Sequence, residues 1–263
     1  MGEVSRNLAD ESNRKMMLFR SWLFVLWLYG SMVVMGLVWL PALLLPRRVT
    51  ILGIRIWAHL ARWGMRVICG ATTEIRGKDH LTSEPVLVAS KHQSTIDTLM
   101  PFIYLKDPCI ILKKELLWYP FFGWYALKAE MIAIDRAGST KALKAMNAQA
   151  KKAASQGRSI LIFPEGTRIE PGVPGNYKPG IALMYKDLGL ECLPVALNTG
   201  FFWPPKGVPR YPGHMVIEFQ PMIETGLQRK AFMKELETRL ETASERLVAE
   251  GKAARAEAGT PVE

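Results

Sequence analysis

The sequence predicts an α/β protein in which helices flank a mixed sheet on both faces, preceded by a membrane-associated helical segment at the N-terminus. Three observations support this. Hydrophobic residues are concentrated near the N-terminus. After Gly70, short apolar runs alternate with helical patterns, as expected for a sheet covered by helices. Charged side chains recur just after several of the apolar runs. A chain of 263 residues can hold one large domain with appendages.

The first predicted element is an apolar helix over residues 21–46. No charged residue occurs from Ser21 to Pro46, and Leu, Val and Trp are frequent. As a helix this run would be roughly 39 Å long, whereas the hydrocarbon core of a bilayer is about 30 Å thick. The run is longer than the apolar part of a cleaved signal peptide, usually about 7–15 residues. We therefore expect it to attach the protein to a membrane.

A second, amphipathic helix is predicted over residues 51–68. Apolar side chains recur at helical spacing, and Arg55, Arg62 and Arg66 lie on another face, a pattern typical of an interfacial helix. Basic residues flank the apolar run on both sides, so charge gives no clear orientation. A spanning helix and a hairpin inserted into one leaflet both stay open. We divide the chain into a membrane anchor (1–70), a catalytic domain (71–250) and a flexible tail (251–263).

The rest of the chain alternates between strands and helices. Apolar, β-branched runs bounded by turn residues indicate the strands, and Ala-rich or amphipathic stretches with a capping Ser, Thr or Gly indicate the helices. The predicted strands are Thr72–Arg76, Pro85–Ala89, Cys109–Leu112, Met131–Ile134, Ser159–Phe163, Glu191–Leu197 and Met215–Phe219. The predicted helices are Ser139–Gln156, Pro179–Leu188 and Gln228–Ala249.

The net charge of +10 indicates an anionic partner, either nucleic acid or an anionic membrane surface. The basic residues are scattered rather than clustered in runs, which favours the membrane and argues against nucleic acid. The three cysteines, Cys69, Cys109 and Cys192, are widely spaced and form neither a disulfide framework nor a zinc pattern. This usage is typical of a reducing compartment.

His92 and Asp97 follow the predicted strand Pro85–Ala89. A histidine close to a carboxylate can take a proton from a hydroxyl, because imidazole titrates near neutrality and the carboxylate fixes its tautomer. The same spacing also fits a helix cap made by Ser94 or Asp97. Ser94 is a rival nucleophile, although the chain has no Gly-x-Ser-x-Gly elbow.

A second string, Phe163 to Arg168, follows another predicted strand. Its glycine, Gly166, permits a sharp turn and close approach of the backbone to a ligand. The planar guanidinium of Arg168 suits a phosphate. The alternative is a structural turn closed by an ion pair between Glu165 and Arg168.

Two further charged pairs follow predicted strands: Lys113-Lys114 and Asp135-Arg136. An open sheet would bring several of these strand ends to one edge. The sequence thus predicts a basic, phosphate-binding cleft with one general base, tethered to a membrane. The aromatic segment over residues 118–125 fits a core, an acyl-chain groove or the membrane interface.

Taken together, these motifs resemble the glycerophospholipid acyltransferase family, most closely its bacterial 1-acyl-sn-glycerol-3-phosphate acyltransferases. Four blocks match in order: a His-x-x-x-x-Asp block (His92 and Asp97), Ile134-Asp135-Arg136, Phe-Pro-Glu-Gly-Thr-Arg (Phe163 to Arg168), and an apolar strand with a central proline (Leu193-Pro194-Val195). The resemblance covers roughly Thr72 to Gln220. One departure is Lys91, where many members have Asn before the histidine.

The resemblance implies a glycerol-3-phosphate acyltransferase-like fold and roles for the motif residues. His92 would be the general base, and Asp97 would orient it. Arg168, helped by Arg136 and Lys114, would hold the acceptor phosphate. Glu165 would position Arg168 or the glycerol, Gly166 would allow close backbone approach, and Thr167 would complete the substrate-binding set.

The reaction implied is transfer of a fatty acyl group from acyl-CoA or acyl-ACP to a lysophospholipid, with 1-acyl-glycerol-3-phosphate as the expected acceptor and phosphatidic acid as the product. Another lysolipid or glycerol-3-phosphate is an open alternative. The resemblance implies no metal and no cofactor beyond the acyl donor, a cell-membrane location, and a catalytic domain on the cytoplasmic side. Outside the family, the rivals are a lipid hydrolase using Ser94 and a membrane-tethered binding protein without catalysis.

Overall fold

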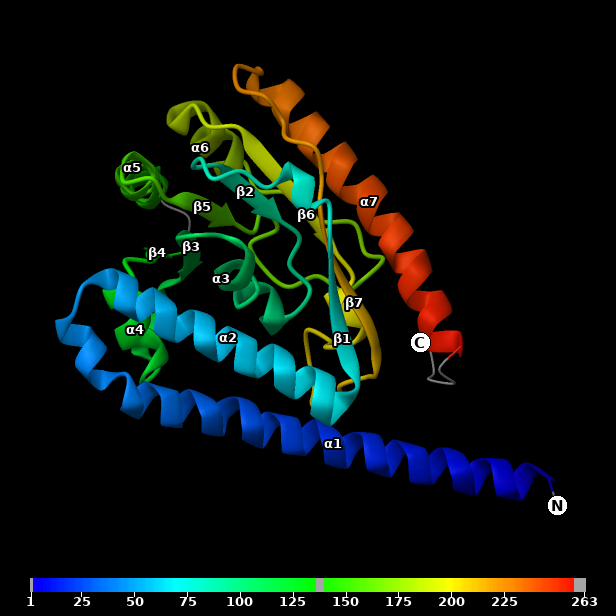
Figure 1. Cartoon of the computed structure of the whole chain (residues 1–263). Helices are drawn as coiled ribbons and strands as arrows, with labels where there is room; N and C mark the ends of the chain where they lie inside the picture. Colours follow the sequence, from blue (N-terminus) through cyan, green and yellow to red (C-terminus); the bar gives the residue numbers. More distant parts are fainter. Residues whose placement is uncertain (1, 136–139, 258–263) are drawn as a thin grey trace.

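The computed structural model describes residues 2–135 and 140–257 and shows a sheet between two layers of helices (Figure 1). One layer contains α2 and α3, and the other contains α5, α6 and α7. The longest helix, α1, runs beneath α2 along the base of the molecule (Figure 1). The predicted fold class, a mixed sheet flanked by helices with an N-terminal helical segment, is therefore confirmed.

The elements agree closely with the alternation predicted from the sequence. The strands are β1 (Ala71–Arg76), β2 (Leu87–Ser90), β3 (Pro108–Lys113), β4 (Ile132–Ile134), β5 (Ser159–Ile162), β6 (Cys192–Leu197) and β7 (Gly213–Phe219). The α-helices are α1 (Gly2–Val38), α2 (Arg47–Cys69), α3 (Pro101–Tyr104), α4 (Phe122–Lys128), α5 (Thr140–Ser155), α6 (Gly180–Leu188) and α7 (Arg229–Glu257).

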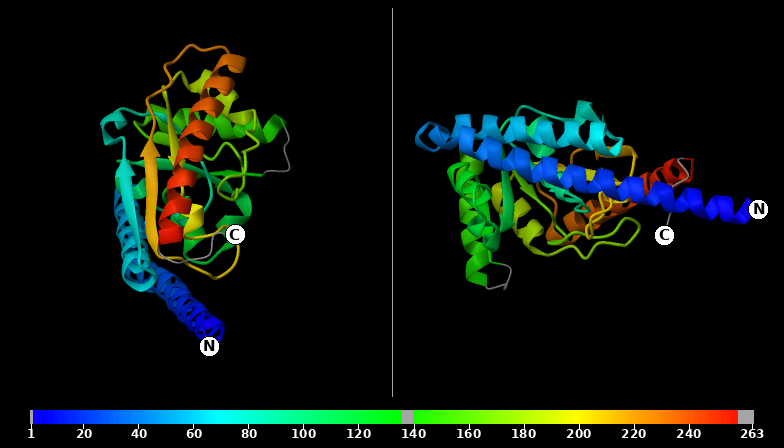
Figure 2. Two further views of the ribbon diagram at one scale, coloured as in Figure 1. Left: turned by 90° about the vertical axis from the view of Figure 1, so that its right-hand side faces the viewer. Right: turned by 90° about the horizontal axis from the view of Figure 1, so that it is seen from below.

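Within the described residues the strands form one seven-stranded sheet in the order β1-β7-β6-β2-β5-β3-β4. From β6 to β4 all neighbouring strands are parallel, whereas β7 runs antiparallel to β6 and parallel to β1. The left view of Figure 2 shows β1 and β7 side by side, with α7 next to them. Because β2 to β6 are parallel, their carboxyl ends lie at one edge of the sheet.

The sheet is buried on both faces, which explains the nearly continuous apolar runs of its strands. Successive strand residues point to opposite faces. In β5, Leu161 packs in the core beneath α2 and α3, whereas Ile160 and Ile162 pack against α5, α6 and α7. The edge near β3 is held by Arg158, a buried arginine whose guanidinium donates hydrogen bonds to the carbonyls of Ala129, Glu130 and Pro108.

The N-terminal apolar region differs in detail from the single helix predicted over residues 21–46. Helix α1 begins earlier and ends at Val38, and Pro41 lies in a short 3₁₀ helix, η1 (Leu40–Leu44). The chain then reverses into α2, which ends at Gly70 in a left-handed conformation. Among the described residues, one helical stretch, Glu11–Val38, is long and apolar enough to cross a membrane.

Besides short helices such as α3, two longer regions were not predicted to be helical. The aromatic segment over residues 118–125 folds partly into α4, preceded by the 3₁₀ helix η4 (Lys114–Trp118). The C-terminal helix continues to Glu257, past the boundary at residue 251 beyond which we expected a flexible tail. The continuation packs on the domain, since Arg255 is buried and its guanidinium lies 4.0 Å from the centroid of the Tyr211 ring.

Candidate active site

The sheet order places the two specific sequence motifs next to each other. Strand β2 lies between β5 and β6, so the residues that follow these three strands meet at one edge. His92 follows β2, Phe163 to Arg168 follow β5, and Thr199 follows β6. The juxtaposition expected from strand ends is present.

His92 and Asp97 face each other across the turn that follows β2. The Nδ1 atom of His92 lies 3.3 Å from Oδ2 of Asp97, and the Asp97 carboxylate is buried. A proton on Nδ1, donated to this carboxylate, leaves Nε2 as the basic nitrogen of the ring. His92 lines a cavity, so this residue faces space that a substrate could occupy.

Asp97 is held by local backbone geometry as well. It lies in a short 3₁₀ helix, η3 (Thr95–Thr98), whose N-cap residue is Ser94. The backbone N–H groups of Gln93 and Ser94 both donate to Asp97 Oδ2 at 2.7 Å, and the Thr199 hydroxyl donates to Oδ1 at 2.6 Å. With Nδ1 of His92, four donor groups thus surround the Asp97 carboxylate and fix its position relative to the imidazole. The capping and catalytic interpretations of the motif are both compatible with this structure.

Ser94 stabilises the turn as the N-cap residue of η3. Its hydroxyl oxygen accepts the backbone N–H of Ile96 at 3.4 Å, and its side chain is fully buried. A hydroxyl in this position caps a helix rather than facing a substrate.

The imidazole of His92 is also fixed by residues of the segment that follows β5. Its ring stacks on Phe163 with centroids 4.1 Å apart. The backbone carbonyl of His92 accepts the N–H of Ile169 at 2.8 Å, and its own N–H donates to Glu165 Oε2 at 2.8 Å. The second motif therefore supports the first through backbone contacts that sequence spacing does not show.

Glu165 forms its ion pair with Lys91 rather than with Arg168. Its carboxylate is buried and faces the ammonium group of Lys91, with Oε1 2.6 Å from Nζ. Burial raises the pKa of the Glu165 carboxyl, and the Lys91 charge opposes that shift. The geometry thus associates Glu165 with the backbone of His92, whereas the resemblance suggested a role toward Arg168 or the glycerol.

Arg168 is exposed and lines the same cavity as His92. Its Nη1 donates to the Thr95 hydroxyl at 3.1 Å. Gly166 adopts a φ of 70°, in the left-handed region that favours glycine, and its N–H closes a turn onto the carbonyl of Phe163 at 3.0 Å. Thr167 is exposed in that turn and does not line the cavity.

The other basic residues expected at the site are not among the described residues that line the cavity. Arg136 lies outside the described residues. Lys114 is exposed and does not line the cavity, whereas its neighbour Lys113 does. Reasoning from sequence missed Arg210, a buried arginine whose guanidinium lies 4.6 Å from the centroid of the Trp203 ring. Burial lowers the pKa of Arg210 to about 10, and the nearby positive charge of Arg168 contributes.

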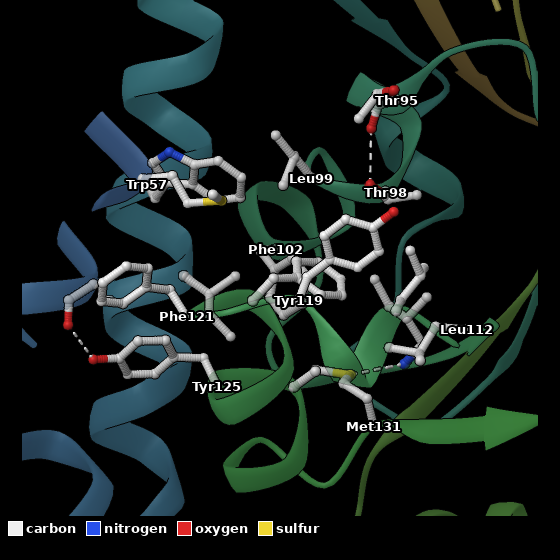
Figure 3. A pocket seen from close by; sticks show the side chains of 18 of the residues that line it. Trp57, Thr95, Thr98, Leu99, Phe102, Leu112, Tyr119, Phe121, Tyr125 and Met131 are labelled. Carbon is white, nitrogen blue, oxygen red and sulfur yellow. Dashed lines mark hydrogen bonds between the residues drawn. The ribbon is translucent and has the colours of Figure 1, made fainter. Parts of the chain in front are cut away.

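The cavity that adjoins His92 has a volume of about 530 Å³, within the usual range for ligand pockets. Figure 3 shows Thr95 and Thr98 on one side of it and Phe121 and Tyr125 on the opposite side. Its lining is mainly apolar and aromatic. Most of the lining residues belong to the helices α1, α2, η4 and α4, to strand β3, and to the segment that follows β2. Examples from the whole lining are Trp57, Leu99, Phe102, Leu112, Tyr119 and Met131 (Figure 3). A slender apolar ligand with a polar end near Thr95 would match this distribution.

The site therefore combines a partly exposed histidine paired with a buried aspartate, an arginine fork and an apolar cavity. This arrangement can deprotonate a hydroxyl on a molecule that carries both an anionic group and a hydrocarbon chain. Among the described residues, no group of three or more His, Cys, Asp or Glu side chains could hold a metal ion.

Comparison with known proteins identifies the family. A family model described as Acyltransferase matches residues 72–198. A curated relative from Pseudomonas aeruginosa, 1-acyl-sn-glycerol-3-phosphate acyltransferase, is 36% identical over 224 residues, which cover 84% of this chain and 87% of the relative. The chain belongs to the acyltransferase family. Another acyltransferase relative of the same name, from Cocos nucifera, is 25% identical over 234 residues, which cover 85% of this chain and 76% of that relative.

The fold is shared with a solved acyltransferase structure. The crystal structure of the 1-acyl-sn-glycerophosphate acyltransferase from Thermotoga maritima superimposes with a TM-score of 0.70 and covers 87% of this chain and 97% of its own. Sequence identity in that alignment is 20%, so this likeness shows a shared fold alone.

Proposed function

We propose that the protein transfers a fatty acyl group from an acyl thioester to the free hydroxyl of 1-acyl-sn-glycerol-3-phosphate, giving phosphatidic acid. The observation that carries this proposal is that His92, paired with Asp97, lines one apolar cavity together with Arg168. The relatives named above supply the acceptor, because their names specify 1-acyl-sn-glycerol-3-phosphate.

His92 acts as general base in the proposed reaction. Its Nε2 takes the proton of the acceptor hydroxyl, and the oxygen forms a bond to the thioester carbonyl carbon. The carbon–sulfur bond then breaks, and the leaving thiolate takes the proton back from the imidazolium. Asp97 stabilises that imidazolium between the two steps. The products are an ester and a thiol, and no acyl-enzyme forms.

In this proposal the cavity holds the lipid parts of the substrates. We assign its aromatic side, formed by Phe121 and Tyr125, to the end of an acyl chain, and its Thr95 side to the reacting carbonyl (Figure 3). Arg168 donates to Thr95 in this structure and lies where its fork can hold the acceptor phosphate. The acyl donor, acyl-CoA or acyl-ACP, is the co-substrate, and no other cofactor is proposed.

The test is acyl transfer by purified His92→Ala protein. Loss of a positioned general base should lower turnover by about 10²–10⁴-fold, while binding to lipid vesicles stays unchanged. His80→Ala is a matched control, because His80 lies in the separate 3₁₀ helix Lys78–His80 and should keep wild-type activity. A panel of lysolipids and glycerol-3-phosphate, each with acyl-CoA and acyl-ACP, identifies the acceptor and the donor. Near wild-type turnover of His92→Ala would refute the proposal.

The lipid-hydrolase alternative loses support from the placement of Ser94. That hydroxyl is buried and accepts a backbone N–H, so it is poorly placed to attack an ester. Labelling of Ser94 by a fluorophosphonate would revive this alternative.

For the membrane attachment we propose insertion of α1 and α2 together into one leaflet on the cytoplasmic side. The two helices pack antiparallel over much of their length, and the right view of Figure 2 shows them side by side against the domain. The indole N–H groups of Trp27 and Trp39 donate to the carbonyls of Leu60 and Val49. The outer face of α1 exposes large apolar side chains, including Phe19, Trp22, Leu26, Val34 and Val38. Such a face suits an interfacial, monotopic anchor.

A further inference from the structure

A buried ion cluster lies directly behind the His92 turn. The Lys91 side chain is 2% exposed, and its Nζ lies 2.6 Å from Glu165 Oε1 and 2.9 Å from Glu241 Oε1. A lysine is almost never fully buried unless it is paired. Among the described side chains, one cation here contacts two carboxylates, and Lys91 immediately precedes the catalytic base.

Glu165 links this cluster to the base. Its Oε1 faces Lys91, and its Oε2 accepts the backbone N–H of His92 at 2.8 Å. The loop after β5 closes tightly over the carboxylate, since a Cβ added at Gly175 would lie 2.6 Å from Glu165 Oε1. A movement of the Glu165 carboxylate would therefore change the hydrogen bond that holds the His92 backbone.

Glu241 brings the C-terminal helix into the cluster. It lies on α7, and its Oε1 accepts the hydroxyl of Tyr177 at 2.6 Å as well as the ammonium of Lys91. Burial raises the pKa of Tyr177, and the hydrogen bond to Glu241 adds to that shift, so the phenol stays protonated as the donor. Glu241 thus holds Lys91 together with Glu165.

We propose that Glu241 is a positioning residue for acyl transfer, acting through Lys91 and Glu165 on the backbone of His92. This inference rests on the proposed role of His92 as general base. Without Glu241, the buried ammonium has a single carboxylate partner and draws Glu165 toward itself, which displaces the His92 turn. A displacement of about 1 Å at a catalytic group can cost about 10²-fold in rate.

The first test compares Glu241→Gln with Glu245→Gln in the full-length protein. Glu245 is an exposed carboxylate one turn further along α7. We expect Glu241→Gln to lower kcat by about 10- to 100-fold, with little change in KM for either substrate, and Glu245→Gln to match wild type. Equal kcat in the two variants would overturn the inference. If Glu241→Gln melts early, Glu241→Asp, which keeps the charge but shortens the reach, replaces it.

The second test is a double-mutant cycle with Lys91→Met. Loss of the cation leaves the Glu165 and Glu241 carboxylates facing each other, so Lys91→Met should lower kcat more than Glu241→Gln does. Adding Glu241→Gln to Lys91→Met removes that repulsion and should raise kcat above the Lys91→Met value. If Glu241 had only a general structural role, the loss of kcat in the double variant would be the sum of the losses in the two single variants, expressed as free energies. An additive loss would overturn the inference.

The pH dependence of kcat supplies an independent readout. The charged groups that face Glu165 are Lys91, from the turn after β2, and Glu241, from α7; Lys91 lowers its pKa and Glu241 raises it. Lys91→Met should therefore shift the acidic limb of the profile to higher pH, and Glu241→Gln should shift it to lower pH. Superimposable profiles would contradict the linkage. The His92→Ala result separates the two hypotheses: activity in that variant refutes the proposed base, whereas inactive His92→Ala with fully active Glu241→Gln refutes only the role of Glu241.

Discussion

At the scale of single residues, His92, the proposed general base, is held by several contacts besides the Asp97 carboxylate. The ring of His92 is stacked on Phe163, its N–H donates to Glu165, and Asp97 accepts from two backbone N–H groups and Thr199. Each of these contacts restrains the imidazole before a substrate arrives. Such pre-organisation removes part of the entropic cost of reaching the transition state.

Arg168 provides the first residue-scale prediction. Arg168→Lys keeps the positive charge but loses the planar fork, so the apparent KM for a phosphate-bearing acceptor should rise by roughly 10-fold, with a smaller change in kcat. Steady-state kinetics with 1-acyl-glycerol-3-phosphate checks this. Arg229→Lys, at an exposed position at the start of α7, is the matched control. An unchanged KM in Arg168→Lys would remove Arg168 from the phosphate role.

At the scale of elements, the cavity results from packing the aromatic segment beside α1 and α2. Helix α4 carries Tyr125, whose hydroxyl donates to the carbonyl of Gly36 in α1 at 2.6 Å. Gly36 has no room for a side chain, because a Cβ there would lie 2.4 Å from the Phe121 ring. Helix α1, the proposed anchor, therefore forms part of the cavity wall, so the proposed acyl site would lie next to the bilayer.

Filling this wall should change acyl-chain preference. Ala126 is buried on α4, lines the cavity and follows Tyr125. Ala126→Leu adds volume on the side away from Thr95, so we expect activity with long-chain donors to fall more than activity with short-chain donors. Competition assays with mixed acyl-CoA lengths measure the ratio. Ala148→Leu, on the exposed face of α5, should leave the ratio unchanged. An unchanged ratio in Ala126→Leu would argue against this assignment of the cavity.

At the scale of the whole molecule, the anchor and the sheet form one packed body. Helix α2 buries Ala58, Ala61 and Met65 in the core shared with the sheet, and α1 packs on α2. Arg20 of α1 also donates to the carbonyl of Ile68. An α1 helix held in this way would carry α2 with it into the membrane, which favours insertion parallel to the surface over a perpendicular span.

Topology can be tested with single exposed cysteines. The native Cys69, Cys109 and Cys192 are buried, so an impermeant maleimide should mainly report introduced thiols. Lys15→Cys, before the apolar part of α1, and Glu245→Cys, on α7, should both react from the cytoplasmic side of membrane vesicles. Detergent-solubilised protein, in which both sites are open, is the control. Labelling of Lys15→Cys from the opposite side alone would show that α1 spans the bilayer.

The sequence by itself determined the alternation of strands and helices, the apolar anchor region and the catalytic His–Asp hypothesis. These features depend on local periodicity, on capping residues and on short motifs, which a single chain displays directly. The extra turns of α7 and the helices around the aromatic segment were missed because packing onto the domain stabilises segments whose local pattern is ambiguous.

Only the tertiary structure decided which distant residues meet at the site. The contact of the Thr199 hydroxyl with Asp97 depends on sheet order, and the contact of the Glu241 carboxylate with Lys91 depends on the path of α7. Local periodicity carries no information on which strands become neighbours. Lys91 departs from the family motif in the sequence. In the structure it is the centre of a buried ion cluster, because β2 lies between β5 and β6 and α7 packs on β6.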